Sequence, residues 1–343
     1  MTIKVLLADD SALVRQVLTD MLQASPDFAV IGCADNGRDA VAKTLALKPD
    51  LVIMDLFMPV LDGIGAIEEI MSLAPTPVLV LSGAVERSEV DLAFNAIKRG
   101  ALDVMEKPAL DSPAALYRFG ERLRDQVRLL AGIRVIRHPR WRPPLQPQQV
   151  PAPAGPVPNI LAIGASTGGP KAVMGVLKSL PASFPATVFI VQHIADGFAE
   201  GFATWLNREC ALPVRLAADG ESFGPGQALV APNGSHLTLC EGRIRLTDQA
   251  PVNCCRPSID VFFGSLAQQP CDRVVSLLLT GMGKDGAQGL LRIKEQGGTT
   301  LVQDEGSCAV FGMPKAAINL DAVNEVLPIE RIPAALAKLF AAP

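Results

Sequence analysis

The sequence predicts two α/β domains joined by a proline-rich linker. The first should hold a doubly wound, five-stranded parallel sheet, and the second a larger, mostly parallel sheet with a β-hairpin. Short apolar runs alternate with amphipathic segments in both halves, as parallel sheets require. Residues 139–158 read PRWRPPLQPQQVPAPAGPVP and show no apolar period, which is typical of an extended linker. The length of 343 residues also fits two domains, since one domain typically takes about 100–200.

The first domain is expected over residues 1–122, followed by a helix and linker over 123–157. Its strands are predicted at Lys4–Ala8, Phe28–Cys33, Leu51–Met54, Val78–Leu81 and Leu102–Met105. The helices between them are predicted at Ala12–Gln23, Arg38–Leu45, Ile64–Ser72 and Glu89–Lys98. A further helix over residues 115–137 carries many arginines, which we interpret as a solvated face.

The second domain is expected over residues 158–343. Its strands are predicted at Ile160–Gly164, Thr187–Gln192, Val274–Thr280 and Thr299–Gln303. Its helices are predicted at Ala172–Ser179, Gly197–Glu209, near residues 286–296 and at Pro314–Ile318. Residues 226–247 predict a hairpin, with turn residues at Asn233-Gly234 and Glu241-Gly242.

Composition and charge exclude several classes of protein. The net charge of -4 and the pI near 5.5 argue against nucleic-acid binding, which needs a basic face. The seven cysteines include no CxxC, so neither a disulfide framework nor a zinc site is predicted. No apolar run reaches the roughly 18 residues that a membrane helix needs, and the N-terminus does not read as a signal peptide. We therefore expect a cytoplasmic protein that is not embedded in a membrane.

Polar side chains follow the predicted strands of the first domain. Asp9 and Asp10 end the first strand, Asp55 the third and Ser82 the fourth, and Lys107 follows the fifth. The carboxyl ends of parallel strands meet at one edge of a sheet, where ligands bind. Carboxylates gathered there would repel one another unless a cation joined them, and such hard oxygen ligands suit Mg²⁺. The set predicts an Mg²⁺ site that receives a phosphoryl group, whose oxygens the lysine and the serine could hold.

These residues resemble the response-regulator receiver family over about residues 1–120. The matching motifs are Asp9-Asp10-Ser11, Asp55, Met58-Pro59, Asp62-Gly63, Ser82-Gly83 and Lys107-Pro108. The resemblance implies a flavodoxin-like fold and phosphorylation of Asp55 by a histidine kinase. It implies Mg²⁺ binding by Asp9, Asp10, Asp55 and the backbone carbonyl of Phe57. It also implies that Ser82 senses the phosphoryl group and that Lys107 pairs with it.

A glycine-rich turn in the second domain holds a candidate nucleophile. Ser166 lies in Gly164-Ala165-Ser166-Thr167-Gly168, a G-x-S-x-G pattern between a predicted strand and a predicted helix. Small flanking residues permit a sharp turn that lifts the hydroxyl above the sheet. N–H groups at the start of the helix could stabilise an oxyanion. The motif alone leaves open a nucleophile, a phosphate-binding loop and a plain tight turn.

A serine nucleophile needs a base, and the chain has three histidines. His193 ends the second strand of this domain, so it lies at the same sheet edge as Ser166. His138 lies at the boundary of the linker, and His236 falls in the predicted hairpin, where a structural or substrate-facing role fits better. His193 is therefore the preferred base.

The acid that would orient this base is not settled by the residues. Asp285 and Asp304 both follow later strands, and the glycines around Asp285 favour it only slightly. The usual α/β-hydrolase order of serine, acid and histidine would require His236 with Asp196 or Asp219, and no clear strand presents those acids. The order serine, histidine, acid fits the strand ends better.

Residues of about 158–343 resemble the chemotaxis protein-glutamate methylesterase family, the CheB family. The matching motifs are Ile163-Gly164-Ala165-Ser166-Thr167-Gly168-Gly169-Pro170, Gln192-His193, Ala231-Pro232, His236-Leu237, Arg256-Pro257-Ser258, Asp260, Leu279-Thr280-Gly281-Met282-Gly283, Asp285-Gly286, Gln303-Asp304 and Phe311-Gly312-Met313-Pro314. One departure is Asp321, which stands before Ala322 where the family usually has a glycine.

The resemblance implies Ser166 as nucleophile, His193 as general base and Asp285 as its orienting acid. It points to backbone N–H groups near Thr167 and Met282 as oxyanion donors, with no cofactor for the ester chemistry. The implied substrates are glutamate methyl esters on cytoplasmic helices of chemoreceptors, and family members also deamidate receptor glutamines.

Three alternatives compete with this interpretation. One is a phosphorylation-switched binding module that uses the Gly164–Pro170 turn as a phosphate loop. A DNA-binding regulator is opposed by the pI and by the lack of a basic helix-turn-helix. An esterase acting on a receptor outside chemotaxis is the third.

Overall fold

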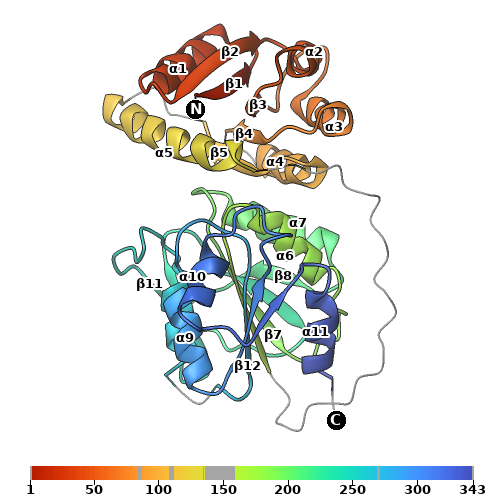
Figure 1. The fold of residues 1–343 in the computed structure, drawn as a ribbon. Helices are drawn as coiled ribbons and strands as arrows, with labels where there is room; N and C mark the ends of the chain where they lie inside the picture. The colour runs from red at the N-terminus through yellow and green to blue at the C-terminus, as the bar shows by residue number, and fades with distance from the viewer. Residues whose placement is uncertain are drawn as a thin grey trace. The chain divides into compact units, whose positions relative to one another are not determined.

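The computed structural model describes residues 2–83, 87–107, 112–133, 135, 159–268 and 271–341, without the side chains of residues 87–89. The chain divides into two compact units, Met1–Arg142 and Pro143–Pro343. Figure 1 shows helices and strands alternating along the chain in each unit. No described helix has both the length and the apolar character that crossing a membrane requires.

The first unit contains a five-stranded parallel sheet in the order β2-β1-β3-β4-β5. The strands are β1 (Ile3–Ala8), β2 (Phe28–Ala34), β3 (Leu51–Asp55), β4 (Val78–Ser82) and β5 (Asp103–Glu106). The helices are α1 (Ala12–Gln23), α2 (Gly37–Leu47), α3 (Gly63–Leu73), α4 (Arg87–Arg99) and α5 (Pro113–Ala131). The predicted doubly wound sheet is confirmed, with its five strands close to the predicted positions.

The core of the first unit shows where this domain ends. Leu123, Val127 and Leu130 of α5 are fully buried and pack with Val5 and Leu7 of β1. Helix α5 runs unbroken past residue 122, because its apolar residues keep helical spacing beneath the sheet. The structure thus places residues 123–131, predicted as a helix between the first domain and the linker, in the first unit. The expected helical residues beyond 133, apart from 135, and the linker lie outside the described residues.

The second unit contains a seven-stranded parallel sheet in the order β14-β13-β12-β6-β7-β9-β8. The strands are β6 (Ile160–Ala165), β7 (Thr187–Gln192), β8 (Val214–Leu216), β9 (Gln227–Val230), β12 (Val274–Leu278), β13 (Thr299–Gln303) and β14 (Glu325–Leu327). The chain builds outward from β6 through β7 on one side and later returns to add β12 on the other. Ligands of such sheets bind where the direction of winding reverses, at the carboxyl end of β6.

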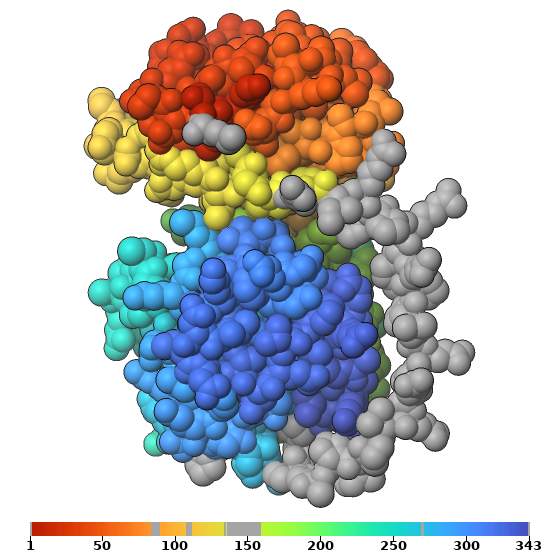
Figure 2. All heavy atoms as spheres, viewed as in Figure 1, coloured from red at the N-terminus to blue at the C-terminus, as the bar shows by residue number. Residues whose placement is uncertain are grey.

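Six helices accompany this sheet among the described residues, and two of them were missed by the sequence prediction. They are α6 (Gly169–Leu177), α7 (Ala199–Glu209), α8 (Ile259–Leu266), α9 (Ala287–Glu295), α10 (Met313–Asn319) and α11 (Ile332–Leu339). The missed helices α8 and α11 span only two turns each, too short for a clear apolar period. Figure 2 shows the C-terminal segments, coloured blue, forming one continuous face of the second unit.

The predicted hairpin over residues 226–247 is only partly correct. Strands β10 (His236–Cys240) and β11 (Arg243–Thr247) are antiparallel, and Cys240 pairs with Arg243 across the turn. Glu241 and Gly242 both have positive φ, as the tight hairpin turn requires. Strand β9 instead joins the large sheet parallel to β7, because its fully apolar Ala228–Val230 is buried on both faces. The bend at Asn233-Gly234 therefore connects two sheets.

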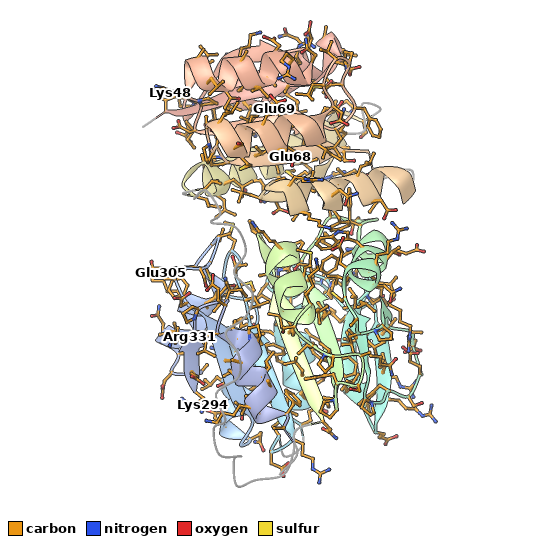
Figure 3. The ribbon with its side chains drawn as sticks, turned by 90° about the vertical axis from the view of Figure 1, so that its right-hand side faces the viewer. Lys48, Glu68, Glu69, Lys294, Glu305 and Arg331 are labelled. Carbon is orange, nitrogen blue, oxygen red and sulfur yellow. The ribbon has the colours of Figure 1, made fainter. Side chains whose placement is uncertain are left out.

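Exposed ion pairs link helices on the surface of each unit. Glu68 and Glu69, labelled in Figure 3, lie on α3 and pair with Arg99 and Arg38 at 2.6 Å each. Such exposed pairs contribute about 0–1 kcal/mol each. In the second unit the Lys294 ammonium, also labelled, donates to the backbone carbonyl of Asp321 at 2.6 Å.

Asp321 stands where the family usually has glycine, and its φ of 54° explains that preference. This left-handed region favours glycine, but aspartate tolerates it better than most residues. The departure thus concerns a turn held by Lys294 and away from the candidate site described below.

Candidate functional site

The acidic side chains of the first unit meet at the carboxyl edge of its sheet. Oxygen atoms of Asp9, Asp10 and Asp55 lie within 4.8 Å of one another. The Lys107 ammonium contacts Asp9 Oδ2 and Asp55 Oδ2 at 2.9 Å each. The side chains of Asp9 and Asp55 are almost fully buried, and Asp10 is exposed. The predicted convergence of these residues is therefore present.

Burial and charge oppose each other in this pocket. Burial raises the pKa of Asp55 and the Asp9 carboxylate adds to this, although the hydrogen bond and charge of Lys107 act against it. Burial also lowers the pKa of Lys107, but its bonds to Asp55 and Asp9 outweigh that effect, so this pKa lies above its ordinary value. The lysine thus stays charged, and Asp55 carries an unfavourable charge that a further cation would relieve.

Two more of the predicted residues frame the same pocket. Ser82 ends β4 next to Asp55 of β3, and its carbonyl accepts the Lys107 backbone N–H at 2.9 Å. The Ser82 side chain is buried. Phe57 follows β3, and its side chain is about half exposed.

The serine and histidine of the second unit follow neighbouring strands. Ser166 comes directly after β6 and His193 directly after β7, and the last pair across these strands is Ala165 with Gln192. The His193 backbone N–H donates to the Ala165 carbonyl at 2.9 Å. Gln192 links the loop after β6 to the loop after β7, because its Nε2 donates to the backbone carbonyls of Ser166 and His193 at 2.8 Å each. The register of the sheet thus brings the two residues together.

His193 pairs with one of the two candidate acids. Its Nε2 lies 2.9 Å from Asp285 Oδ2, in the loop after β12. Asp304, the other candidate, accepts the backbone N–H of Ser307 at 3.0 Å within its own loop. The geometry therefore distinguishes two acids between which the residues alone favoured Asp285 only slightly.

Asp285 accepts hydrogen bonds from several groups in addition to His193. Its Oδ1 accepts the Ser258 hydroxyl at 2.7 Å and the Asn253 amide at 2.8 Å, and its Oδ2 accepts the Ile259 backbone N–H at 2.7 Å. Burial raises the pKa of Asp285, but His193, Asn253 and Ser258 outweigh it and lower the value to about 2. Asp285 is thus ionised and fixed in orientation.

The roles of Ser258 and Asn253 were not predicted. Ser258 belongs to a motif quoted for the family resemblance, and that motif was the only signal that could have identified it. Both residues are distant from Asp285 in the sequence, so only the fold joins them.

The charge state of His193 reflects opposing effects. Burial disfavours the imidazolium and is the largest single effect on the pKa of His193. Hydrogen bonds and charge from Asp285 and Cys255 outweigh it and raise this pKa to about 9. The Cys255 sulfur lies 3.6 Å from His193 Nδ1. Asp285 thus lies beside Nε2 of the His193 ring, and Cys255 lies beside Nδ1.

Two backbone N–H groups lie free near the serine. Within the described residues, neither the Thr167 nor the Met282 N–H donates a hydrogen bond to the protein. The backbone at Gly281 approaches so closely that an added Cβ would lie 2.6 Å from Ser166 Cβ. Gly168 has a φ of 75°, which lets helix α6 begin immediately after the turn. Donors from two loops therefore stand beside Ser166.

Ser166 and His193 are not hydrogen-bonded through their side chains in the described part of this structure. Among the described residues, the Ser166 hydroxyl has no hydrogen bond to His193. Catalytic hydrogen bonds are commonly long in ligand-free enzymes and shorten when substrate binds.

His236 does not act as the base of this site. His236 is buried, with Nε2 at 3.1 Å from the Ala250 carbonyl and Nδ1 accepting the Ser258 backbone N–H at 3.1 Å. Both nitrogens are thus bound to backbone, which excludes the alternative order that required His236 as base. His138 lies outside the described residues.

Comparison with known proteins identifies both units. Residues 161–336 match the family model for the CheB methylesterase, and residues 5–116 match the response regulator receiver domain. The chain is 47% identical over 338 residues to protein-glutamate methylesterase/protein-glutamine glutaminase 2 of Anaeromyxobacter dehalogenans, covering 98% of this chain and 97% of that protein. It is 42% identical over 340 residues to the protein of the same name from Pseudomonas aeruginosa, covering 98% and 96% of the two chains.

A solved structure agrees with this assignment. The catalytic domain of the Thermotoga maritima CheB methylesterase superposes with a TM-score of 0.51 at 36% identity, covering 53% of this chain and 98% of that one. The chain therefore belongs to the CheB methylesterase family, with a response regulator receiver domain preceding the esterase domain.

Proposed function

We propose that this chain hydrolyses glutamate methyl esters on the cytoplasmic helices of chemoreceptors, with Ser166 as nucleophile. The observation that carries the proposal is the pairing of His193 with Asp285, 2.9 Å apart, on the sheet edge that also presents Ser166. Relatives that match the whole chain carry the names methylesterase and glutaminase, which supports both ester hydrolysis and glutamine deamidation. Because the substrate lies on cytoplasmic helices, we expect this protein in the cytoplasm.

The proposed reaction is an acyl transfer in two halves. The Ser166 hydroxyl oxygen attacks the ester carbonyl carbon while its proton passes to His193. The tetrahedral intermediate collapses, the bond to the methoxy group breaks, and His193 protonates the leaving methanol. Water then attacks the acyl-enzyme with His193 again as base, which releases the glutamate carboxylate and restores Ser166. For a glutamine the same steps release ammonia.

The surrounding residues orient and stabilise this reaction. Asp285 accepts a hydrogen bond from the N–H at His193 Nε2, so Nδ1 is the nitrogen that takes the Ser166 proton. The N–H groups of Thr167 and Met282 are the proposed donors to the oxyanion, because neither is used within the described protein.

The receiver domain implies Mg²⁺-dependent phosphorylation by a kinase phosphodonor. We assign the ion to Asp9, Asp10 and the carbonyl of Phe57, together with Asp55. The clustered carboxylate oxygens match the hard ligands that Mg²⁺ prefers, and the raised pKa of Asp55 reflects a charge lacking compensation. The ion would offset charge between the carboxylates and an incoming phosphoryl group.

Phosphorylation is proposed to act at Asp55. A carboxylate oxygen of Asp55 attacks the phosphorus atom, and the bond between phosphorus and the histidine nitrogen of the kinase breaks. Lys107 would then exchange its contact with the Asp55 carboxylate for the phosphoryl oxygens, and the Ser82 hydroxyl would bind them as well. For phosphorylation to activate hydrolysis, the phosphorylated form must favour an arrangement in which receptor reaches Ser166.

The test is methanol release from methylated cytoplasmic fragments of chemoreceptors. Release by the wild-type chain that rises with a small phosphodonor and Mg²⁺ is the expected result. A folded, phosphorylated chain that releases no methanol from any receptor fragment would remove the proposed substrate. Ammonia release from fragments with glutamine at the same positions tests the deamidation.

Substituting Asp55→Asn should remove activation and leave the esterase intact. The amide cannot accept a phosphoryl group, so the ratio of methanol release with and without phosphodonor should fall to about one. The unstimulated rate should persist, because Asp55 and the esterase triad belong to separate units. Stimulation that survives this substitution would place the phosphoryl acceptor elsewhere.

The pH profile should report the raised pKa of His193. Only the neutral imidazole can accept the serine proton, so kcat/KM should rise about tenfold per pH unit and level off near pH 9. The rate of a Ser166→Ala chain, subtracted at each pH, removes spontaneous ester hydrolysis. A rise centred near the ordinary value of about 6.5 would show that Asp285 and Cys255 do not stabilise the imidazolium as described.

A further inference from the structure

We propose that Cys255 and His193 form a binding site for a zinc ion, and that zinc bound there inhibits hydrolysis. The binding is independent of the proposed function, whereas the inhibition rests on it. The absence of a CxxC motif predicted no zinc site, because that test considers only ligands that lie close together in the sequence.

The first argument is the distance between the two ligand atoms. Cys255 Sγ lies 3.6 Å from His193 Nδ1. Tetrahedral zinc binds thiolate sulfur at about 2.3 Å and imidazole nitrogen at about 2.0–2.1 Å, which sets the two ligands about 3.6 Å apart. The separation of the two atoms therefore matches that of a thiolate and an imidazole bound to one zinc ion.

The second argument is the second nitrogen of the ring. Asp285 Oδ2 lies 2.9 Å from Nε2 and fixes the N–H there, so Nδ1 is the nitrogen that can give up its proton and offer a lone pair to a metal. Zinc-binding histidines commonly donate their other N–H to a carboxylate in this manner. Asp285 lies near enough to complete a cluster of His193, Cys255 and Asp285. Its oxygens already accept bonds from Ser258, Asn253 and Ile259, so we assign it to orienting the histidine.

The third argument is the turn that positions the thiol. Val252 and Cys255 exchange backbone hydrogen bonds of 3.1 and 2.9 Å across a tight turn. Its central residues, Asn253 and Cys254, have φ values of 51° and 62°, a conformation that costs free energy in residues other than glycine. Cys255 is intermediate in burial. The surrounding structure thus holds the sulfur against the histidine before any metal binds.

Below about pH 9, binding would replace one proton on each ligand with the ion. The Cys255 S–H, which points to the Asn253 carbonyl at 3.4 Å, loses its proton to solvent as the sulfur–zinc bond forms. Nδ1, which carries a proton below the His193 pKa of about 9, releases that proton to solvent and contributes its lone pair, and water takes the remaining positions. Since Nδ1 is also the nitrogen proposed to accept the Ser166 proton, bound zinc removes the base. The soft thiolate should select zinc over Mg²⁺, which the oxygen cluster of the receiver should prefer.

The test measures zinc binding to the full chain in millimolar Mg²⁺ by competition with a chromogenic chelator. The wild type should bind one zinc ion more tightly than the Cys255→Ala and Cys255→Ser chains, by at least about 100-fold for loss of a thiolate ligand. Cys254→Ala is the matched control, because it removes the exposed neighbouring thiol and should retain the site. With Co²⁺, the wild type should show a thiolate-to-metal charge-transfer band that both Cys255 variants lack.

Inhibition is measured as the ratio of each variant's hydrolysis with zinc to its own rate without zinc. The Cys255 variants should require at least about tenfold more zinc for half-inhibition, and a chelator should restore the wild-type rate. A tight site that persists in both Cys255 variants, or disappears in Cys254→Ala, overturns the assignment. Zinc binding through Cys255 without any hydrolysis of receptor esters would overturn the proposed function and leave the metal site standing. Hydrolysis that zinc does not inhibit, despite binding at Cys255, would overturn the inhibition.

Discussion

Replacing Ser166 with alanine should lower methanol release by about 10⁵–10⁶-fold. The substitution removes the only atom proposed to form a bond with the substrate, while the turn and the N–H groups of Thr167 and Met282 remain. The measurement is single-turnover and steady-state methanol release with an excess of methylated receptor fragment. Phosphorylation of Asp55 in the same chain, followed with a labelled phosphodonor, should be unchanged.

This substitution also distinguishes the esterase from a phosphate-binding loop. Alanine would leave a loop that binds phosphate through its backbone largely intact, so phosphate binding that survives without hydrolysis in any chain would favour that alternative. The matched control is Ser179→Ala, whose hydroxyl caps the end of α6 through the Val176 carbonyl at 2.6 Å, away from the turn. Hydrolysis in Ser166→Ala within tenfold of the wild type would exclude Ser166 as nucleophile.

Replacing Asp285 with asparagine should lower kcat by about 10³–10⁴-fold. The carboxylate accepts hydrogen bonds from His193, Ser258, Asn253 and Ile259, and an amide has only one oxygen to offer them. In one orientation, the NH₂ group of the new asparagine would face the N–H and O–H donors around it. In the other, it would donate to His193 Nε2 and so leave the ring proton on Nδ1, the nitrogen that should accept the Ser166 proton. KM should change little, because Asp285 is buried and acts through His193.

A second expected result separates this chemical role from a purely structural one. The imidazolium loses its charged partner in Asp285→Asn, so the rise of kcat/KM with pH should shift below the wild-type value of about 9. Asp304→Asn is the control, because its carboxylate binds within its own loop and should leave the pH profile in place. A similar loss of activity in both variants, with unchanged profiles, would contradict the assignment of Asp285.

Much of the site was predictable because parallel sheets place their loops regularly. Ser166 follows β6 and His193 follows β7, so strand assignment alone placed them at one edge. The same holds for Asp9 and Asp55, which end neighbouring strands β1 and β3. A short apolar strand is recognisable from local composition, and its carboxyl end fixes the position of the next residue to within a few ångströms.

The errors came where local sequence carries little information. Strands β8 and β14 have only three residues each, and helices α8 and α11 only eight. Strand β9 was mistaken for an arm of a hairpin, since a turn of Asn and Gly is compatible with either partner. Strand pairing depends on which surface remains unpaired after the rest of the sheet forms.

By itself the sequence determined the two α/β domains, the acidic pocket of the receiver, and the serine and histidine of the esterase. It did so because these features depend on short-range periodicity and on residues next to strand ends. The residues alone favoured Asp285 over Asp304 only slightly, and the tertiary structure placed Asp285 against His193, brought Ser258 and Asn253 to that carboxylate, and set Cys255 against His193. Those contacts join segments up to 92 residues apart, and their geometry follows from packing the whole domain, which no local pattern encodes.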